Sequence, residues 1–203
     1  MTLEKDLHDA LTELIGLGIG KAADVLNSML DSHIILSIPS VRLVAADELI
    51  LILSRDAGRN LSAVQMRYTG SMQGAVELIF SSGEAGKLVD CIIGEETVME
   101  EGLDSIRAGT LCEVGNIVIN ALMGTLSNVL SLDFTYTVPA FIEGDAVRLV
   151  ADVGVPENSV VLLAETEFLV ESKSIRGSIA VFFSMASFRL LEEKVHRYSG
   201  GAL

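Results

Sequence analysis

The sequence predicts an α+β fold made of duplicated α-β-β-β-α units with pseudo-twofold symmetry, in which helices flank an antiparallel β-sheet. Two observations predict it. Two stretches of the chain resemble each other at a constant offset of 100 residues, which matches Glu13 to Glu113 and Pro39 to Pro139. Self-similarity at a fixed offset indicates a structural repeat. Each copy also places short strand-like segments between two helix-like segments, and such short strands need antiparallel partners.

The expected elements follow from the spacing of apolar side chains. Residues 3–31 and 105–131 have apolar positions three and four residues apart, which predicts an amphipathic helix at the start of each copy. Segments rich in β-forming residues predict strands at 33–44, 47–54, 60–69 and 74–80, with counterparts at 133–142, 146–153, 159–171 and 177–183. A closing helix is expected at 83–94 in the first copy and at 185–198 in the second.

We expect one domain spanning 1–203, because 203 residues are enough to bury a substantial core. Its two repeats cover about 3–94 and 105–198 and are joined by an acidic connector at 95–104, which is most simply a solvated surface segment. The first predicted strand of each repeat contains one proline. A proline there suits an edge strand or a strand end, where a missing N–H costs no ladder bond.

Composition excludes several classes of protein. Half of the residues are hydrophobic, so the chain is not disordered, and 14 basic against 28 acidic residues give a net charge of −14. That charge argues against binding nucleic acid, which requires phosphate neutralisation. No uninterrupted apolar run approaches the ~20 residues of a membrane span, and the first residues lack the order of a secretory signal. Cys91 and Cys112 fit a reducing compartment. We therefore expect a soluble cytoplasmic protein.

The helix predicted at 105–131 has two distinct faces at ~100° per residue. Its apolar stripe consists of Leu111, Val114, Val118, Leu122 and Val129. The opposite face carries Glu113, Asn116, Asn120 and Ser127, with Met123 at its margin. Glu113 and Asn116 are three residues apart, so their side chains are neighbours. By periodicity alone, a carboxylate and an amide on an outer helix face are most simply a solvated surface.

The first-copy helix has Gly16 and Gly20 where the second has Asn116 and Asn120. Gly18 lies between them, and each mid-helix glycine costs about 1 kcal/mol relative to alanine. Such a conflict often has a packing reason, such as the close approach of another backbone element. A nucleotide-binding loop does not fit, because these glycines lie within a helical pattern that no strand precedes.

Other candidate chemistry is weak. His8, His33 and His196 are scattered, and none has metal-ligand spacing with an acid or a cysteine, so no metal site is predicted. Cys112 is followed by Glu113, whereas a reactive thiol needs electropositive surroundings. We expect both cysteines to be inert small residues.

The residues Glu113, Asn116 and Pro139 form the spacing E-x2-N-x22-P. This pattern resembles the signature of the CheC/CheX/FliY phosphatases of bacterial and archaeal chemotaxis, and the resemblance covers most of the chain because a tandem duplication of this length is typical of CheC. The first copy keeps a degenerate form of the same frame, which consists of Asp9, Glu13 and Pro39.

The resemblance implies an enzyme that accelerates hydrolysis of the aspartyl phosphate of a CheY-type response regulator. It further implies that Glu113 contacts a lysine of the regulator and docks the helix, and that Asn116 orients a water molecule for in-line attack. Gly16 removes the amide from the first copy, so one competent site is expected. The chain would need no cofactor of its own, because Mg²⁺ is carried by the regulator.

The physical chemistry agrees with these roles, since hydrolysis of an acyl phosphate depends mainly on positioning and on electrostatic stabilisation. A neutral amide can donate and accept hydrogen bonds without repelling the phosphoryl group. The second copy departs from the family pattern at Gly109, where Asp or Ser is usual, although Thr110 is adjacent. That departure removes a partner that could orient Glu113.

Two alternatives stay open. The first is a non-catalytic binding module of the same fold, either an adaptor like those of the flagellar switch or a binding partner of the deamidase CheD. The amide at position 116 favours the enzyme, whereas Gly109 favours the module. The second is an unrelated acidic ligand-binding domain, which would make the in-register repeat a coincidence.

Overall fold

The computed structural model describes residues 5–30, 34–56, 60–93, 103–154, 159–170 and 173–200. Its helices are α1 (Lys5–Leu30), α2 (Ala46–Asp56), α3 (Ser82–Ile93), α4 (Leu103–Leu130), α5 (Ala146–Val153) and α6 (Met185–Gly200). Its strands are β1 (Ile34–Ala45), β2 (Leu61–Gly70), β3 (Gly74–Ser81), β4 (Phe134–Tyr136), β5 (Ala140–Gly144), β6 (Val160–Val170) and β7 (Lys173–Phe183). Most of the acidic connector predicted at 95–104 lies outside the described residues.

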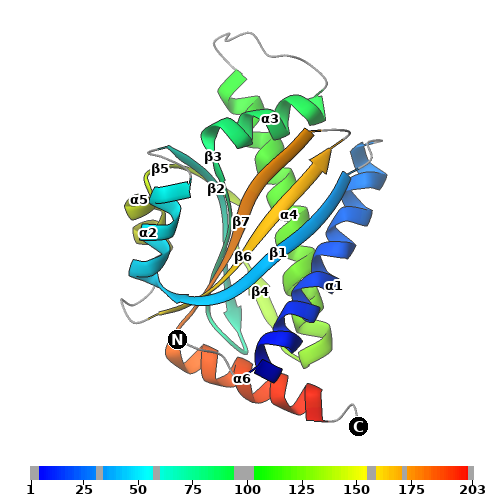
Figure 1. Cartoon of the computed structure of the whole chain (residues 1–203), viewed down its shortest axis with the longest axis vertical. Helices are drawn as coiled ribbons and strands as arrows, with labels where there is room; N and C mark the ends of the chain where they lie inside the picture. The colour runs from blue at the N-terminus through cyan, green and yellow to red at the C-terminus, as the bar shows by residue number, and fades with distance from the viewer. Residues whose placement is uncertain are drawn as a thin grey trace.

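The described strands form one antiparallel sheet in the order β1-β6-β7-β3-β2-β4, and β5 pairs with β2 along the same edge as β4 (Figure 1). The central pair is β3 with β7, and the order is symmetric about it. The first strand of each half of the chain pairs with a strand of the other half: β1 with β6, and β4 and β5 with β2. The prediction of a duplicated α+β fold with an antiparallel sheet is confirmed.

The strands predicted at 47–54 and 146–153 are wrong, because these segments form the helices α2 and α5. The α2 segment contains a continuous apolar run, for which periodicity cannot distinguish a strand from a helix. In the structure Leu49 and Leu53, one helical turn apart, are buried, whereas Leu51 between them is 61% exposed.

Helix α5 has clear end signals. The side chain of Asp145 accepts a hydrogen bond from the backbone N–H of Arg148 at 2.8 Å, which caps the first turn. Gly154 ends the helix in the left-handed conformation with φ of 66°. The order of elements in each half is therefore α-β-α-β-β-α rather than the predicted α-β-β-β-α.

The two motif prolines lie at the outer edges of the sheet, in or next to edge strands, as predicted. Pro39 lies in the edge strand β1, at a shift in the β1–β6 register between Ser37 and Ser40. Pro139 separates β4 from β5, so the single strand expected at 133–142 is two short strands. Proline has no backbone N–H to donate to a ladder, which explains both interruptions.

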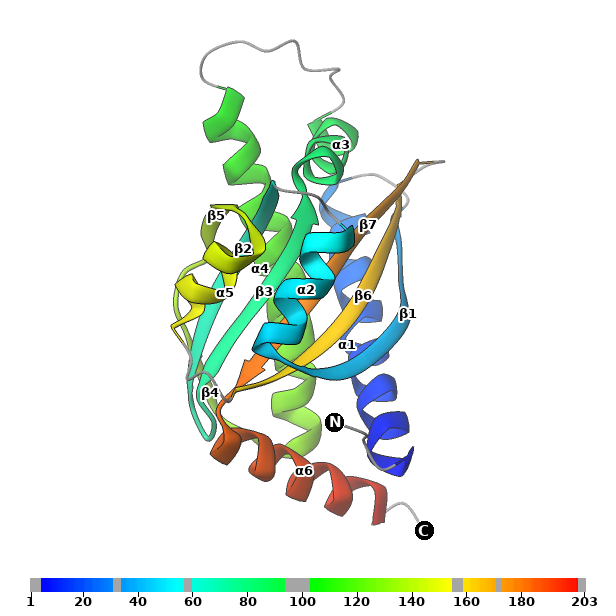
Figure 2. The same cartoon turned by 60° about the vertical axis from the view of Figure 1, so that its left-hand side comes forward.

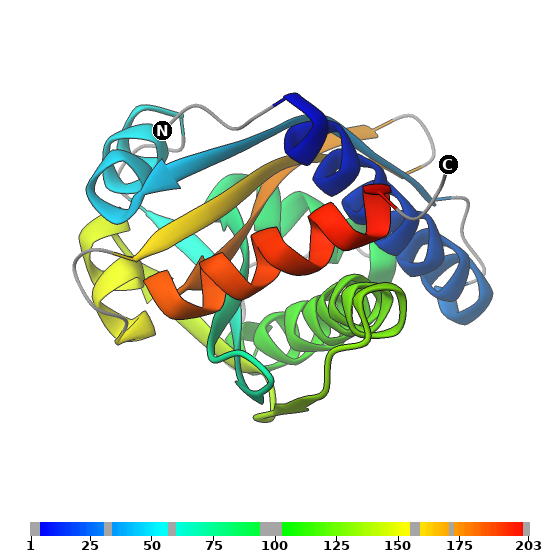
Figure 3. The same ribbon diagram turned by 90° about the horizontal axis from the view of Figure 1, so that it is seen from below.

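Helices cover both faces of the sheet (Figure 2). Helices α2 and α5 pack on one face over a smaller apolar core, and α1 and α4 pack on the other over the larger core. Helix α6 crosses the end of the sheet beside α1 and α4, and its buried side chains join the larger core (Figure 3). Helices α1 and α4, which carry Glu13 and Glu113, thus lie on the same face of the sheet.

Helix α4 is long and apolar enough, by length and composition, to cross a membrane. In the structure its apolar side chains instead form core with the sheet and with α1. The predicted stripe from Leu111 to Leu122 is buried, and Met123, expected at the margin, is also fully buried. Helices α1, α3 and α6 and the sheet all contact α4, so its buried surface is wider than one stripe.

The glycines of α1 separate into two kinds. A Cβ atom on Gly18 would lie 2.8 Å from the Cα of Leu122, so this glycine permits the close crossing of α1 and α4. Gly16 and Gly20 have no neighbouring atom within 4 Å of an added Cβ. The predicted packing reason therefore holds for Gly18 alone.

Candidate functional site

Glu113 and Asn116 lie together on the outer face of α4. Glu113 is exposed and Asn116 is half-buried, while Leu111 and Val114, on the opposite side of the helix, are buried in the core. The spacing of three residues places both polar side chains on one surface, as the sequence predicts. The pair is therefore held toward solvent by a helix whose other side is fixed by packing.

Asn120 continues this surface by one turn. Its Nδ2 donates a hydrogen bond to Oδ1 of Asn116 at 2.7 Å, and Asn120 is exposed. The sequence places Asn120 on the same face but gives it no role. The signal was present in the spacing, since side chains four residues apart on a helix are in contact distance.

Gly115 brings α4 close to the sheet immediately before Asn116. A Cβ atom at this position would lie 2.5 Å from Cγ1 and 2.6 Å from Cβ of Val64 on β2. Ordinary contacts between carbon atoms are about 3.5–4.0 Å. The absence of a side chain at Gly115 therefore allows the short distance between α4 and β2 next to Asn116.

The carboxylate of Glu113 has no hydrogen-bond or ion-pair partner among the described side chains. Gly109, one turn earlier, has open space around it, and the Thr110 hydroxyl donates to the backbone carbonyl of Ile106 at 2.9 Å. Thr110 is thus engaged by its own helix. The pKa of the neighbouring Cys112 thiol is raised by burial and then by Glu113, which agrees with an unreactive thiol.

The first copy of the motif, on α1, keeps its two acidic residues but has no side-chain amide at the position that corresponds to Asn116. Asp9 and Glu13 are both exposed, and Oδ1 of Asp9 lies 3.5 Å from Nδ1 of His8. Gly16 and Gly20 are exposed at the positions that correspond to the two asparagines of α4. This face can make ionic contacts, but it presents no amide that could orient water.

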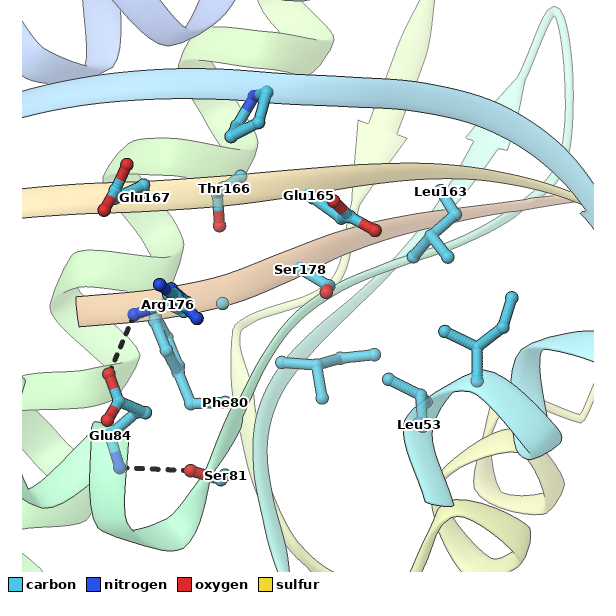
Figure 4. A pocket seen from close by; sticks show the side chains of 14 residues that line it. Leu53, Phe80, Ser81, Glu84, Leu163, Glu165, Thr166, Glu167, Arg176 and Ser178 are labelled. Carbon is cyan, nitrogen blue, oxygen red and sulfur yellow. Dashed lines mark hydrogen bonds between the residues drawn. The ribbon is translucent and has the colours of Figure 1, made fainter. Parts of the chain in front are cut away.

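A pocket lies away from this surface (Figure 4). It has a volume of about 670 Å³ and lies between α2 and the start of α3, over β6 and β7. Its carboxylates, from Glu84, Glu165 and Glu167, each already accept a hydrogen bond from a neighbouring group. Oγ1 of Thr166, which also lines the pocket, is buried without a partner among the described residues. We place no chemistry in this pocket, because its carboxylates are already engaged. Among the described residues, no group of His, Cys, Asp or Glu side chains could hold a metal ion.

A second titratable group lies at the centre of the sheet. Glu77 is fully buried and is paired with Ala180 in the β3–β7 ladder. Burial raises its pKa to about 7, although Nε2 of Gln65 donates to its Oε1 at 2.8 Å and opposes the shift. Oε2 has no partner among the described residues. Glu77 is far from solvent and is not part of the α4 surface.

No family model matches the chain. The CheY-P phosphatase CheC of Bacillus subtilis is 24% identical over 139 residues, which cover 68% of this chain and 66% of that relative. The matched part thus spans just under two thirds of the curated relative.

Solved structures are similar over more of the chain. FliY of Thermotoga maritima has a TM-score of 0.74 at 20% identity, with complete coverage of both chains. A chain of the FliG–FliM complex from H. pylori has a TM-score of 0.70 at 14% identity and covers 94% of this chain and 100% of that one. A chain of the CheX–CheY–BeF3–Mg²⁺ complex from Borrelia burgdorferi has a TM-score of 0.55 at 20% identity, with 85% and 99% covered. At these identities the likeness concerns the fold.

Proposed function

Because this chain has the fold of the CheC/CheX/FliY proteins, we propose that it is a phosphatase for the aspartyl phosphate of a CheY-like response regulator, acting through α4. The observation that carries the proposal is the amide of Asn116, which the outer face of a packed helix holds toward solvent beside Glu113. The sequence relationship to CheC and the CheX–CheY complex among the structural neighbours support this choice of substrate.

In this proposal Glu113 docks and Asn116 catalyses. Among the described residues the Glu113 carboxylate has no hydrogen-bond or ion-pair partner, so it is free to pair with a cationic side chain of the regulator. Docking places the Asn116 amide beside the acyl phosphate, where it accepts a hydrogen bond from the attacking water. Such positioning supplies a large part of the rate enhancement when the transition state is loose.

No acid or base of shifted pKa is needed on this chain. An amide adds no negative charge next to the phosphoryl group, whereas a carboxylate at the same place would repel it. The regulator supplies Mg²⁺ in this proposal, and the chain contributes the oriented amide alone. One site is competent, because Gly16 leaves α1 without the corresponding group.

The test uses a response regulator that has been phosphorylated with a small-molecule donor, and it measures the rate of phosphate loss with and without this protein. We expect Asn116→Ala to lower the catalysed rate by about 10²–10³-fold, as loss of one preorganised hydrogen-bonding group does in other enzymes. Glu113→Ala should raise KM for the regulator and lower the rate. Asn128→Ala, an exposed asparagine two turns beyond Asn120 on α4, is the matched control.

Undiminished activity of Asn116→Ala with a normal unfolding curve would contradict the mechanism.

A second candidate is a binding module without hydrolytic activity, and the TM-score of 0.70 to a chain of the FliG–FliM complex favours it. Such a module would bind a flagellar switch component, or CheD, as its partner. It would bind without accelerating dephosphorylation in the same assay.

A further inference from the structure

Resting on the proposed function, we propose that Asn120 is a positioning residue that restrains rotation of the Asn116 side-chain amide. Nδ2 of Asn120 donates to Oδ1 of Asn116 at 2.7 Å. A side-chain amide has both donors and an acceptor, so either member of the pair can supply the donor. In both cases the bond ties the Asn116 amide to the next turn of α4.

The bond leaves other groups of Asn116 free. With Asn120 as the donor, Oδ1 of Asn116 has two lone pairs, and Asn120 occupies one of them. The second lone pair can accept a hydrogen from the attacking water, and both hydrogens of Nδ2 can donate to phosphoryl oxygens. Without Asn120, the broad terminal torsion of an asparagine leaves the Asn116 amide free to rotate. The bound regulator would then meet a misplaced amide part of the time.

Packing gives no reason for Asn120. The side chain is exposed, and asparagine is a weaker helix former than alanine. The fold would therefore be served at least as well by alanine at this position. A residue that costs helix stability and whose side chain bonds to Asn116 is explained by what it does for that amide.

The duplication supplies an independent observation. In α1 both asparagines are replaced together, by Gly16 and Gly20, while Glu13 is kept. Open space surrounds both glycines, so packing does not forbid a side chain at either position. The joint replacement is expected if the two amides work as one unit.

The experiment measures kcat and KM for the phosphorylated regulator in four variants of the full chain. Asn120→Ala should lower kcat about three- to tenfold, the effect of one hydrogen bond, and leave KM within twofold. Asn120→Asp should lower kcat further, because its carboxylate adds a negative charge beside the phosphoryl group. Asn128→Ala should change neither constant. Thermal unfolding of Asn120→Ala should occur at the wild-type temperature or above it.

The fourth variant is the double mutant Asn116→Ala/Asn120→Ala. If Asn120 acts only through Asn116, the double mutant has the rate of Asn116→Ala alone. An unchanged kcat in Asn120→Ala would overturn the inference, as would a further fall of the rate in the double mutant, and either result leaves the proposed function intact. A wild-type chain with no phosphatase activity would overturn both together.

Discussion

The contact between Gly115 and Val64 gives the sharpest prediction about how the fold supports the site. Gly115→Ala would place a methyl group 2.5–2.6 Å from Cγ1 and Cβ of Val64, about 1 Å inside normal contact. Rotation about χ1 of Val64 moves Cγ1 but leaves Cβ in place. The clash is therefore relieved only if α4 moves away from β2.

The cost can be worked from this geometry. Overpacking of a core typically costs about 1–3 kcal/mol, and replacing glycine by alanine in a helix returns about 1 kcal/mol. We expect Gly115→Ala to lower the free energy of unfolding by up to about 2 kcal/mol. An unfolding entropy of about 2.1 cal/mol/K per residue over 203 residues converts this loss into a fall in Tm of about 5 °C. A shift of α4 by ~1 Å would also lower the phosphatase rate, by up to about 10²-fold.

The assay is thermal and urea unfolding followed by circular dichroism, with two companion variants. Gly124→Ala in the same helix meets no atom within 4 Å, so it should raise Tm by about 2 °C. Val64→Ala alone should cost about 1.6 kcal/mol, since two buried methyl groups are lost. In the Gly115→Ala background the same change should cost less, because it removes the clashing Cγ1 and Cγ2 atoms and leaves only the contact with Cβ.

This coupling of 1 kcal/mol or more between neighbouring sites is the decisive quantity. The reasoning would be refuted by a Gly115→Ala protein as stable as the wild type, or by additive effects of the two substitutions. Either result would mean that the contact between Gly115 and Val64 does not set the distance between α4 and β2.

Two further predictions concern Glu77 and the α1 face. The folded-state pKa of Glu77 is raised to about 7 from an ordinary 4.5. The contribution of the protonated side chain to the free energy of unfolding is therefore fully present below about pH 4.5 and is lost as pH rises through 7. Glu77→Gln should therefore be more stable than the wild type by about 3 kcal/mol at pH 8 and equal to it at pH 4.5, measured by urea unfolding; equal stability at both pH values would contradict the shift. Gly16→Asn with Gly20→Asn, introduced into Asn116→Ala protein, should restore phosphatase activity on the face that keeps Glu13, and a protein that stays inactive would show that this face does not dock the regulator.

Much of the architecture could be predicted because the chain contains an internal comparison. The offset that matches Glu13 to Glu113 aligns the two long helices, and the apolar stripe of α4 orients its polar face correctly. Prolines at 39 and 139 correctly indicate outer strands. These features follow from periodicity and backbone chemistry, which are local properties.

The parts that could not be predicted depend on contacts distant in sequence. The apolar run of α2 is consistent with strand or helix, and only the burial of Leu49 and Leu53 under one helical face decides between them. The reason for Gly18 is visible only in the crossing of α1 and α4, where this glycine lies against Leu122. Gly16 and Gly20 look the same in the sequence but have no such contact. The bond from Asn120 to Asn116 needed side-chain coordinates.

The pairing of β1 with β6, and of β5 with β2, has a consequence for how such a chain could have arisen. A shorter ancestor with a single copy would have a first strand without a neighbour in the sheet. It could complete the sheet only as a dimer in which two identical molecules exchange that strand. Fusion of two such genes would convert a reciprocal dimer into one polypeptide. It would also free the two α-helical faces to diverge, so that one could lose its amides while the other kept them.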